Sequence, residues 1–285
     1  MTNAPGPADP RERWGELTRQ ERDAAYDNNA ATINSAALVA ARNEASAAFR
    51  ARRNWRLDLP YGPEAHQKWD IYPAADRQAP VLIFIHGGYW QRNSRELFAI
   101  MAEGALDRGL TVAMPGYTLA PAATMTQIVA EIFAALDWLV REGATQGAGG
   151  PAIVSGWSAG AQLAALALAH PHVRAGAGIS GVYELGPLRD TGLDAALKLT
   201  DAEVSHFSPL RLPPTLKPFI LAYAGAELPA LVHDSRRLHA IRSAAQAPGW
   251  LMPIADANHF TVLDALREPS GEILRAILAL AEFAK

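Results

Sequence analysis

A serine between two glycines stands in the middle of the chain, where residues 156–160 read GWSAG. A short apolar segment at 152–155 precedes it, and an alanine-rich segment with helical spacing, 159–169, follows it. In this arrangement a serine occupies a sharp strand-to-helix turn, and its hydroxyl is raised at the positive end of the helix. The glycines leave room for a strained turn in which larger side chains would collide. The spacing therefore predicts that Ser158 is a nucleophile.

A second glycine-rich motif, HGGYW at residues 86–90, directly follows an apolar run at 81–85. Glycines leave the backbone N–H groups unshielded, so that they can approach a substrate oxygen. We expect the N–H of Gly87 or Gly88, together with that of Ala159, to form an oxyanion hole, which stabilises the charge that develops during acyl transfer. His86 is expected to brace this loop rather than to act as the base.

A serine nucleophile needs a base, and the base needs an acid that orients it. When the serine lies on a strand-to-helix turn, the acid and then the histidine follow it along the chain. Of the later histidines, His259 lies in a loop between the last predicted strand and a helix, and it is the expected base. The expected acid is Glu227, the first carboxylate after the strand predicted at 219–223, with Asp234 on the next helix as the alternative.

Aromatic residues flank the predicted reaction centre. Tyr89, Trp90 and Trp157 adjoin the two motifs, and Trp14 and Tyr26 stand nearer the amino terminus. The first three are the expected substrate-binding residues, to which the amino-terminal segment could add the other two. This composition favours a flat aromatic leaving group joined to a small acyl group. The alternative is that the tryptophans pack in the core, because indole rings are mostly buried.

The elements that must position these residues alternate between strand and helix from residue 56 onward. Strands are expected at 56–59, 68–72, 81–85, 110–114, 152–155, 176–180, 219–223 and 250–254, and helices at 96–108, 126–141, 159–169, 231–245 and 272–283. The first two strands flank a turn and are expected to form a hairpin. Such alternation predicts an α/β fold, with a mostly parallel sheet of about eight strands covered by helices on both faces. We therefore assign residues 56–285 to one α/β domain.

Two segments depart from this pattern. Residues 1–55 are polar and alanine-rich, and two or three short helices are expected between residues 12 and 53. They lack the apolar content to fold alone, so we expect a helical arm that packs on the main domain. Residues 185–218 interrupt the alternation and are proline-rich toward their end, which suggests a cap or lid.

Composition excludes several classes of protein. Of the 285 residues, 49% are hydrophobic and 19% are charged, a balance that does not fit a disordered chain. The net charge of −3 gives no reason to expect nucleic acid or an anionic membrane as a partner. The absence of cysteine excludes disulfides, zinc–thiolate sites and thiol nucleophiles. With a polar, proline-rich stretch at 1–10 and no secretory signal, we expect a cytoplasmic protein that uses no cofactor or metal; a homodimer is left open.

Together these motifs resemble α/β-hydrolases of the esterase and lipase group with an HGG-x-W loop, and more narrowly the arylformamidase (kynurenine formamidase) branch. The resemblance covers roughly residues 56–275 and rests on residues 86–91, 116–121, 156–164, 179–183 and 259–260. It implies the α/β-hydrolase fold, no metal, and a triad that maps onto Ser158, Glu227 and His259. Formamidases of this branch carry aspartate where this chain has Glu227.

The expected function is therefore that of a serine hydrolase that cleaves a small-acyl ester or amide, as a carboxylesterase or an arylformamidase does. Two alternatives stay open. A serine peptidase on the same fold would need a recognition site for a peptide terminus, and nothing in the sequence marks one. A non-catalytic relative that only binds ligands would usually lack a member of the triad, whereas this chain has a candidate for each.

Overall fold

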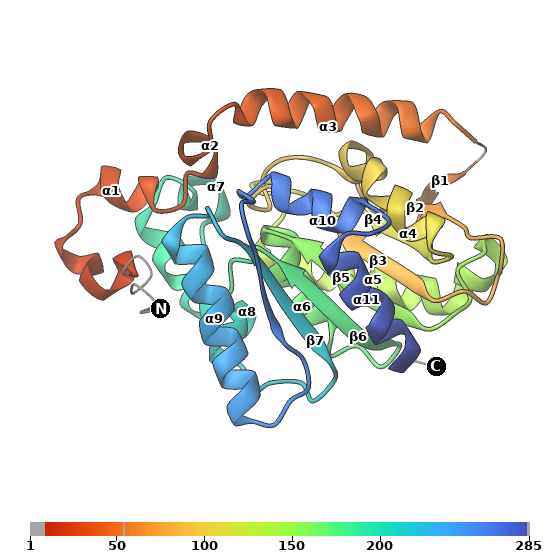
Figure 1. Cartoon of the computed structure of the whole chain (residues 1–285). Helices are drawn as coiled ribbons and strands as arrows, with labels where there is room; N and C mark the ends of the chain where they lie inside the picture. The colour runs from red at the N-terminus through yellow and green to blue at the C-terminus, as the bar shows by residue number, and fades with distance from the viewer. Residues whose placement is uncertain (1–8, 54, 284–285) are drawn as a thin grey trace.

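An eight-stranded sheet forms the centre of the protein, as the computed structural model in Figure 1 shows. The structure describes residues 9–53 and 55–283. The strands are β1 (Arg56–Pro60), β2 (Lys68–Tyr72), β3 (Val81–Ile85), β4 (Thr111–Pro115), β5 (Ala152–Trp157), β6 (Val173–Ile179), β7 (Phe219–Ala224) and β8 (Leu251–Ile254). Their order across the sheet is β1-β2-β4-β3-β5-β6-β7-β8; β2 pairs antiparallel with both β1 and β4, and the other pairs are parallel. The expected α/β fold, with its initial hairpin, is confirmed.

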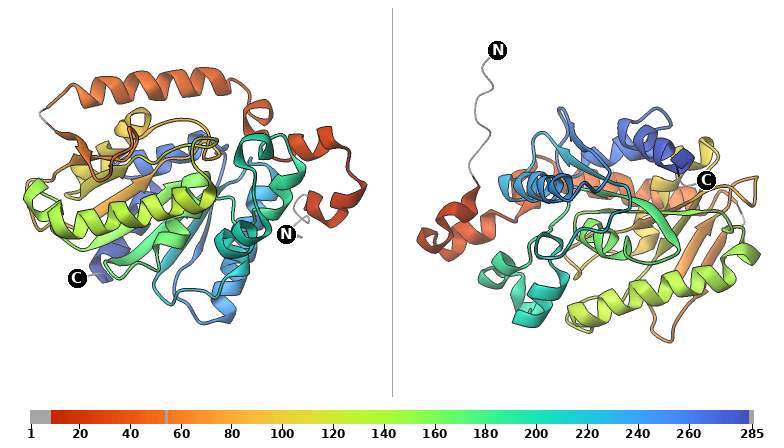
Figure 2. Two further views of the ribbon diagram at one scale, coloured as in Figure 1. Left: turned by 180° about the vertical axis from the view of Figure 1, so that it is seen from behind. Right: turned by 90° about the horizontal axis from the view of Figure 1, so that it is seen from below.

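Helices cover both faces of this sheet, as Figures 1 and 2 show together. One face carries α5 (Met125–Glu142), α6 (Ala159–Ala167) and α9 (Pro229–Ala244), and the other carries the 3-10 helix η2 (Arg95–Ala102), α4 (Glu103–Asp107), α10 (Asp264–Arg267) and α11 (Glu272–Phe283). Strand β3 shows why both layers form. Val81, Ile83 and Ile85 enter the first core, Leu82 and Phe84 enter the second, and all five are buried. A strand with apolar side chains on both sides is stable only when both faces of its sheet are covered.

The single helix expected over residues 96–108 is wrong in its first half, which is the 3-10 helix η2. The side chain of Ser46 explains the difference. Its hydroxyl donates to the carbonyl of Leu97 (3.0 Å) and accepts from the N–H of Ile100 (3.2 Å). Both groups would otherwise take part in α-helical hydrogen bonds, so this contact from another segment competes with regular helix.

The amino-terminal arm comprises η1 (Pro10–Glu16), α1 (Arg19–Ala24), α2 (Asn28–Ala31) and α3 (Ser35–Arg50). Three of these helices are short, as expected, but α3 is sixteen residues long and crosses the top of the molecule in Figure 1. The side chains of Val39, Arg42, Ser46 and Phe49 recur at helical spacing and share its inner face. Phe49 anchors the end of α3, since its ring stacks on Trp55 at a centroid distance of 5.4 Å.

The segment expected to be a cap, 185–218, folds into η4 (Gly186–Asp190), α7 (Asp194–Leu197), α8 (Asp201–Phe207) and η5 (Pro209–Arg211). It lies beside the arm, and Figure 2 shows the two together in its left view. Trp14 donates from Nε1 to Asp190 (2.9 Å), and Asp23 of the arm accepts from the N–H of Gly192 (2.6 Å). Arm and cap segment are therefore tied directly to each other, and the role of this segment as a cap or lid stays a prediction.

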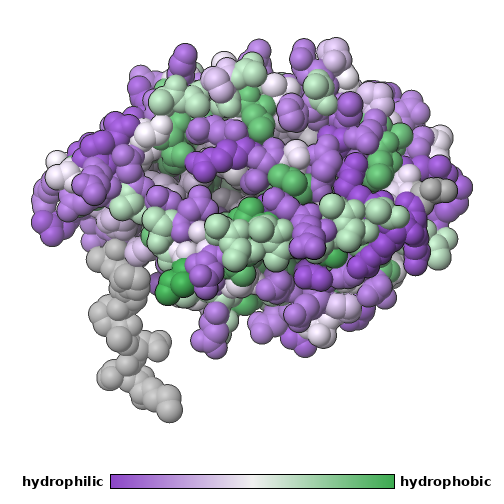
Figure 3. Space-filling model, turned by 90° about the horizontal axis from the view of Figure 1, so that it is seen from above, coloured by the Kyte–Doolittle hydropathy of each residue, from purple (hydrophilic) through white to green (hydrophobic). Residues whose placement is uncertain are grey.

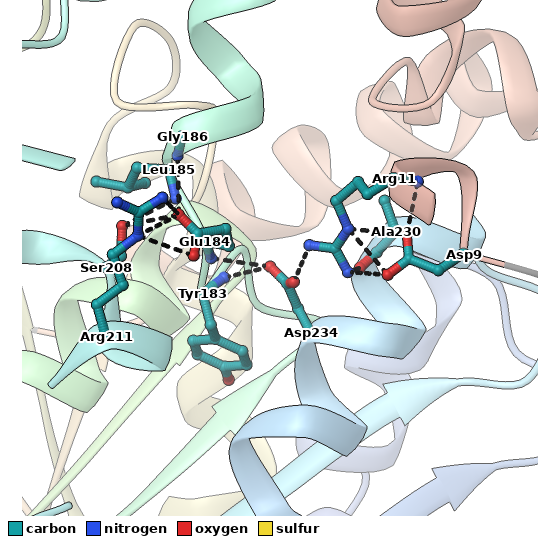
Figure 4. A network of polar contacts seen from close by, with 10 residues as sticks. All are labelled: Asp9, Arg11, Tyr183, Glu184, Leu185, Gly186, Ser208, Arg211, Ala230 and Asp234. Carbon is teal, nitrogen blue, oxygen red and sulfur yellow. Dashed lines mark hydrogen bonds and ion pairs between the residues drawn. The ribbon is translucent and has the colours of Figure 1, made fainter. Parts of the chain in front are cut away.

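A buried carboxylate joins the arm to the main domain, in the network drawn in Figure 4. Asp234 of α9 forms an ion pair with Arg11, and Arg11 also binds Asp9 at 2.8 Å. The second oxygen of Asp234 accepts from the N–H groups of Tyr183 (2.6 Å) and Glu184 (3.0 Å), just beyond β6. Because the Asp234 side chain is 1% exposed and that of Arg11 is 9%, water can satisfy neither charge well if the pair is broken.

Figure 3 shows the molecule from above, the side that α3 crosses in Figure 1. Most of this face is hydrophilic, and its hydrophobic residues are scattered among polar ones. Within residues 9–53 and 55–283, no helix has both the length and the apolar character needed to cross a bilayer. Residues 1–8 lie outside the described part, so the expectation about a secretory signal in the first ten residues stays a prediction.

Replacing Arg11 by alanine is expected to destabilise the protein. The change leaves the buried carboxylate of Asp234 without its cation, and breaking such a pair from one side typically costs about 3 kcal/mol of the free energy of unfolding. Urea denaturation of the wild type and of Arg11→Ala measures the loss. Arg13→Ala is the matched control, since this neighbour pairs with Glu16 in solvent and should change stability by less than about 1 kcal/mol. Equal effects of the two substitutions would contradict a structural role for the Arg11–Asp234 pair.

Candidate active site

Ser158 lies between the end of β5 and the start of α6, in an unusual backbone conformation with φ 57° and ψ −122°. Its N–H donates to the carbonyl of Ile179 at 2.8 Å, which holds the turn against β6. A Cβ added to Gly156 would lie 2.1 Å from the carbonyl oxygen of Gly160, and one added to Gly160 would lie 2.1 Å from that of Ile85. The two glycines are therefore required by direct backbone contact, and the strained turn they permit raises the serine side chain out of the sheet.

The structure brings His259 to this serine. The Nε2 atom of His259 lies 3.2 Å from Ser158 Oγ, within hydrogen-bond reach. The indole of Trp157 holds the histidine loop, because its Nε1 donates to the backbone carbonyl of His259 at 2.8 Å and the two rings lie 4.8 Å apart. His259 is 4% exposed, so its ring is shielded from water on most sides.

Glu227 is the carboxylate that contacts His259. It follows β7, its side chain is fully buried, and its Oε1 contacts Nδ1 of His259. Its other oxygen accepts from the N–H of Ala224 at 3.3 Å, which directs the carboxylate back along the end of the strand. The alternative acid, Asp234, is instead engaged by Arg11 and by two backbone N–H groups in the network of Figure 4. Of the two candidate acids, only Glu227 contacts the histidine.

The loop after β3 closes over the same turn. A Cβ on Gly87 would lie 2.9 Å from Cβ of Ser158, so only glycine allows this approach. The carbonyl of Gly87 accepts from Asn93 Nδ2 (3.1 Å) and faces the His86 ring. Because a trans peptide directs N–H and C=O to opposite sides, the N–H of Gly88 points away from those partners. The N–H of Ala159 begins α6, where the first backbone donors have no partner within the helix.

His86 supports this loop from below. Its ring stacks on Tyr117 with centroids 4.4 Å apart and planes 8° apart, and its Nδ1 lies 2.9 Å from the carbonyl of Gly87. The hydroxyl of Tyr117 donates to the backbone carbonyl of His86 at 2.9 Å. Complete burial lowers the pKa of His86 to about 4, since a charged imidazole there would lose its hydration. The ring is therefore neutral near pH 7 and braces the loop.

A cavity of about 580 Å³ opens above Ser158 and His259. Its aromatic walls come from β5 and from three connecting segments and comprise Tyr26, Tyr89, Trp157 and Phe260. The arm supplies much of the remaining lining, and the cap segment adds Thr191, Gly192 and Leu193. The hydroxyl of Tyr89 donates to the carbonyl of Tyr26 (2.7 Å) and accepts from Asn28 Nδ2 (3.2 Å). The arm is thus joined to the glycine-rich loop at the wall of the cavity.

Two aromatic residues expected near the substrate lie elsewhere. Trp90 is fully buried in the core, where its Nε1 donates to Gln162 at 3.2 Å, and it does not line the cavity. The turn in front of it, with positive φ at both Tyr89 and Trp90, sends the two side chains in different directions. Trp14 packs edge-on against Tyr26 with centroids 6.1 Å apart, outside the cavity lining. The alternative reading, that tryptophans here pack in the core, holds for Trp90.

Sequence reasoning missed the cavity residues that belong to α3, above all Arg42. The helical spacing of α3 could have indicated this residue, because Arg42 occupies the same face of the helix as the buried Ser46 and Phe49. A charged residue on an inward-facing stripe is unusual enough to mark a position for attention. Phe260 was noted only as part of the final motif, and the structure adds its ring to the cavity wall.

Comparisons with known proteins agree with this architecture. The family model BD-FAE matches residues 69–175. Kynurenine formamidase from Salmo salar is 24% identical, with 94% of this chain and 98% of that protein aligned. Esterase LipQ from Mycobacterium tuberculosis is 32% identical, over 45% of this chain and 35% of that protein.

Solved structures give the same fold. A thioesterase candidate from Silicibacter sp. TM1040 superposes with a TM-score of 0.80 at 26% identity, covering 90% of this chain and 99% of that one. This chain has the α/β-hydrolase fold. Esterase B from Lactobacillus rhamnosis, at 20% identity, superposes with a TM-score of 0.70 over 93% of this chain and 97% of its own length, which shows the shared fold.

The homologues found are hydrolases, namely esterases and kynurenine formamidases. In the described part of this chain, no group of three or more His, Asp or Glu side chains is arranged to hold a metal ion. The serine and the imidazole line the cavity, and the buried carboxylate lies behind the imidazole. Such an arrangement can support nucleophilic attack with general base assistance.

The buried His86 predicts a specific pH dependence of stability. The unfolded chain binds a proton at this residue below about pH 6.5, whereas the folded protein resists protonation until about pH 4. The unfolded state therefore binds more protons in this window, and the contribution to stability is complete above pH 6.5 and is lost as the pH falls, by up to about 3 kcal/mol.

Urea denaturation at about pH 7 and about pH 4.5 measures this loss. The variant His86→Gln should be less stable at pH 7 but should lose less stability between the two pH values than the wild type does. If both proteins lose the same amount, another group is responsible for the pH dependence.

Proposed function

We propose that this protein is a serine hydrolase that cleaves a small-acyl ester or amide, with an aromatic leaving group, through an acyl-enzyme. The observation that carries the proposal is the hydrogen-bonded series Ser158–His259–Glu227 at the floor of a cavity. A nucleophile, a base within hydrogen-bond reach of it, and a buried carboxylate that orients the base are the three parts that serine-dependent acyl transfer requires.

In the first step, Ser158 attacks the carbonyl carbon of the substrate. Nε2 of His259 takes the hydroxyl proton, and the resulting imidazolium is stabilised by the carboxylate of Glu227. The negative charge moves onto the former carbonyl oxygen, where the N–H groups of Gly88 and Ala159 stabilise it. Gly87 supports this step by letting the loop backbone approach the serine. One such donor is typically worth about 3 kcal/mol of transition-state stabilisation.

The tetrahedral intermediate then collapses. The bond to the leaving group breaks, the imidazolium returns its proton to the departing oxygen or nitrogen, and the acyl group stays on Ser158. In the second half, His259 removes a proton from water, the resulting hydroxide attacks the acyl-enzyme, and the serine leaves with that proton. The products are the free leaving group and a carboxylic acid, and the protein returns to its starting state.

The choice of substrate class rests on the cavity and on the relatives. Tyr89, Trp157 and Phe260 offer flat apolar surfaces next to the serine, which suit an aromatic ring. Kynurenine formamidases align over 94% and 79% of this chain in two fish species, and these names point to a formyl group on an aromatic amine. Esterases also align with this chain, so we expect both formamides and aryl acetates to be substrates.

The nucleophile is tested by labelling. An aryl fluorophosphonate should modify the wild type at one serine, and Ser158→Ala should remain unmodified and lose about 10⁴-fold or more of kcat. Ser155→Ala is the matched control: this hydroxyl is buried in β5 three residues earlier and makes no hydrogen bond within the described residues, so labelling and kcat should stay near those of the wild type. Near-normal hydrolysis by Ser158→Ala would exclude this residue as the nucleophile.

The substrate preference is tested with a panel. We expect hydrolysis of N-formylkynurenine and of small aryl acetates, with kcat/KM falling as the acyl group lengthens to butyryl and hexanoyl. Steady-state kinetics on this series gives the ratios directly. Activity on aryl esters together with none on the formamide would remove the formamidase assignment and leave the carboxylesterase assignment in place.

A further inference from the structure

Arg42 lies on the inner face of α3 and lines the same cavity as Ser158 and His259. Its guanidinium stands over the ring of Phe98, 4.0 Å from the centroid, and Phe98 in turn lies 5.6 Å from Trp157. This series of contacts connects the arginine to the wall of the reaction centre. The guanidinium is therefore placed over a ring that itself packs against a wall of the cavity.

No carboxylate pairs with Arg42 within residues 9–53 and 55–283. Its Nε and Nη2 donate to the neighbouring Asn43 Oδ1, at 3.3 and 2.9 Å. The acidic residues that line the cavity are occupied by other donors: Asp23 accepts from the N–H of Gly192 (2.6 Å), and Asp27 from the N–H of Ala30 (3.0 Å). The cavity is thus lined by a half-buried cation that forms no ion pair among the described residues.

Three other partly buried or buried arginines, Arg11, Arg50 and Arg95, each contact at least one aspartate. The buried Arg242 has no carboxylate partner either, but it donates to three backbone carbonyls. A buried cation is costly unless it is paired, and the contact with Phe98 recovers only part of that cost. Burial lowers the pKa of Arg42 to about 10, so the group still carries its charge at neutral pH. An anion that enters the cavity would supply the missing partner.

We propose that Arg42 is a specificity-determining residue that binds a carboxylate of the substrate. The ligand class is then an aromatic compound with a small acyl group at one end and a carboxylate at the other. A guanidinium suits this role because it can donate two parallel hydrogen bonds to a carboxylate. The inference rests on the proposed function for the reaction at Ser158, but anion recognition can be measured without turnover.

A matched substrate pair tests the proposal by kinetics. One member is 3-(4-acetoxyphenyl)propanoate, and the other is the uncharged 3-(4-acetoxyphenyl)propanamide, with the same ring and the same scissile ester. For the wild type, kcat/KM should be about 10-fold or more higher for the propanoate, as expected for a charged hydrogen-bonded pair. Arg42→Met, which keeps a long side chain over Phe98, should raise KM for the propanoate and bring the ratio to about 1, while Arg42→Lys should restore part of it.

Arg22→Met is the control variant. Arg22 also belongs to the arm and also stands over an aromatic ring, that of Trp14 at 5.8 Å, but it does not line the cavity. It should keep the preference of the wild type. Equal losses on both substrates in Arg42→Met, or no preference in the wild type, would overturn the proposal, because a residue that only packs would affect both substrates alike.

Binding separates this inference from the proposed function. In the Ser158→Ala background, which cannot form an acyl-enzyme, 3-(4-hydroxyphenyl)propanoate is titrated by calorimetry with and without Arg42→Met. The substitution should raise Kd by about 10-fold or more. Binding that depends on Arg42, without any serine labelling of the wild type, would refute the hydrolase proposal and support anion recognition. Hydrolysis by the wild type, together with binding that does not depend on Arg42, would support the hydrolase proposal and refute anion recognition by Arg42.

Discussion

The candidate site depends on one close contact between backbones, where the β5–α6 turn meets the loop after β3. Gly160 touches the carbonyl of Ile85, Gly156 touches the carbonyl of Gly160, and Gly87 lies against Ser158. A methyl group at any of these three positions would have to occupy space that backbone or side-chain atoms already fill. The contact keeps the strained serine turn in place and also sets how closely the loop after β3 approaches Ser158.

The parallel order of the strands places the serine, the carboxylate and the histidine at one edge of the sheet. Ser158, Glu227 and His259 follow β5, β7 and β8, whose carboxyl ends all lie at the same edge because these strands are parallel. Ligand sites in open α/β sheets form in the crevice outside those ends for this reason. Residues separated by up to 101 positions thereby come within hydrogen-bond distance.

The arm turns an open sheet edge into a walled cavity. Its contacts include the buried Arg11–Asp234 pair at the cap side and those of Tyr89 with Tyr26 and Asn28 at the glycine-rich loop. Figure 1 shows that α3 then continues across the top of the molecule. Arg42 reaches the cavity only through this course, so charge recognition and closure of the site depend on the same segment.

Local sequence determined the layered architecture and the two glycine-rich motifs. A run of five apolar residues such as 81–85 needs cover on both faces whatever surrounds it, and glycines at 156 and 160 mark a turn that no other residue fits. Four features depend on contacts between distant segments. Asp234 pairs with Arg11, so Glu227 is the carboxylate that contacts His259, and the hydroxyl of Ser46 favours a 3-10 helix at η2. The amide of Gln162 holds Trp90 in the core, and the path of α3 brings Arg42 to the cavity. Sequence periodicity reports which side of an element is buried, whereas the partner that buries it is set by the fold as a whole.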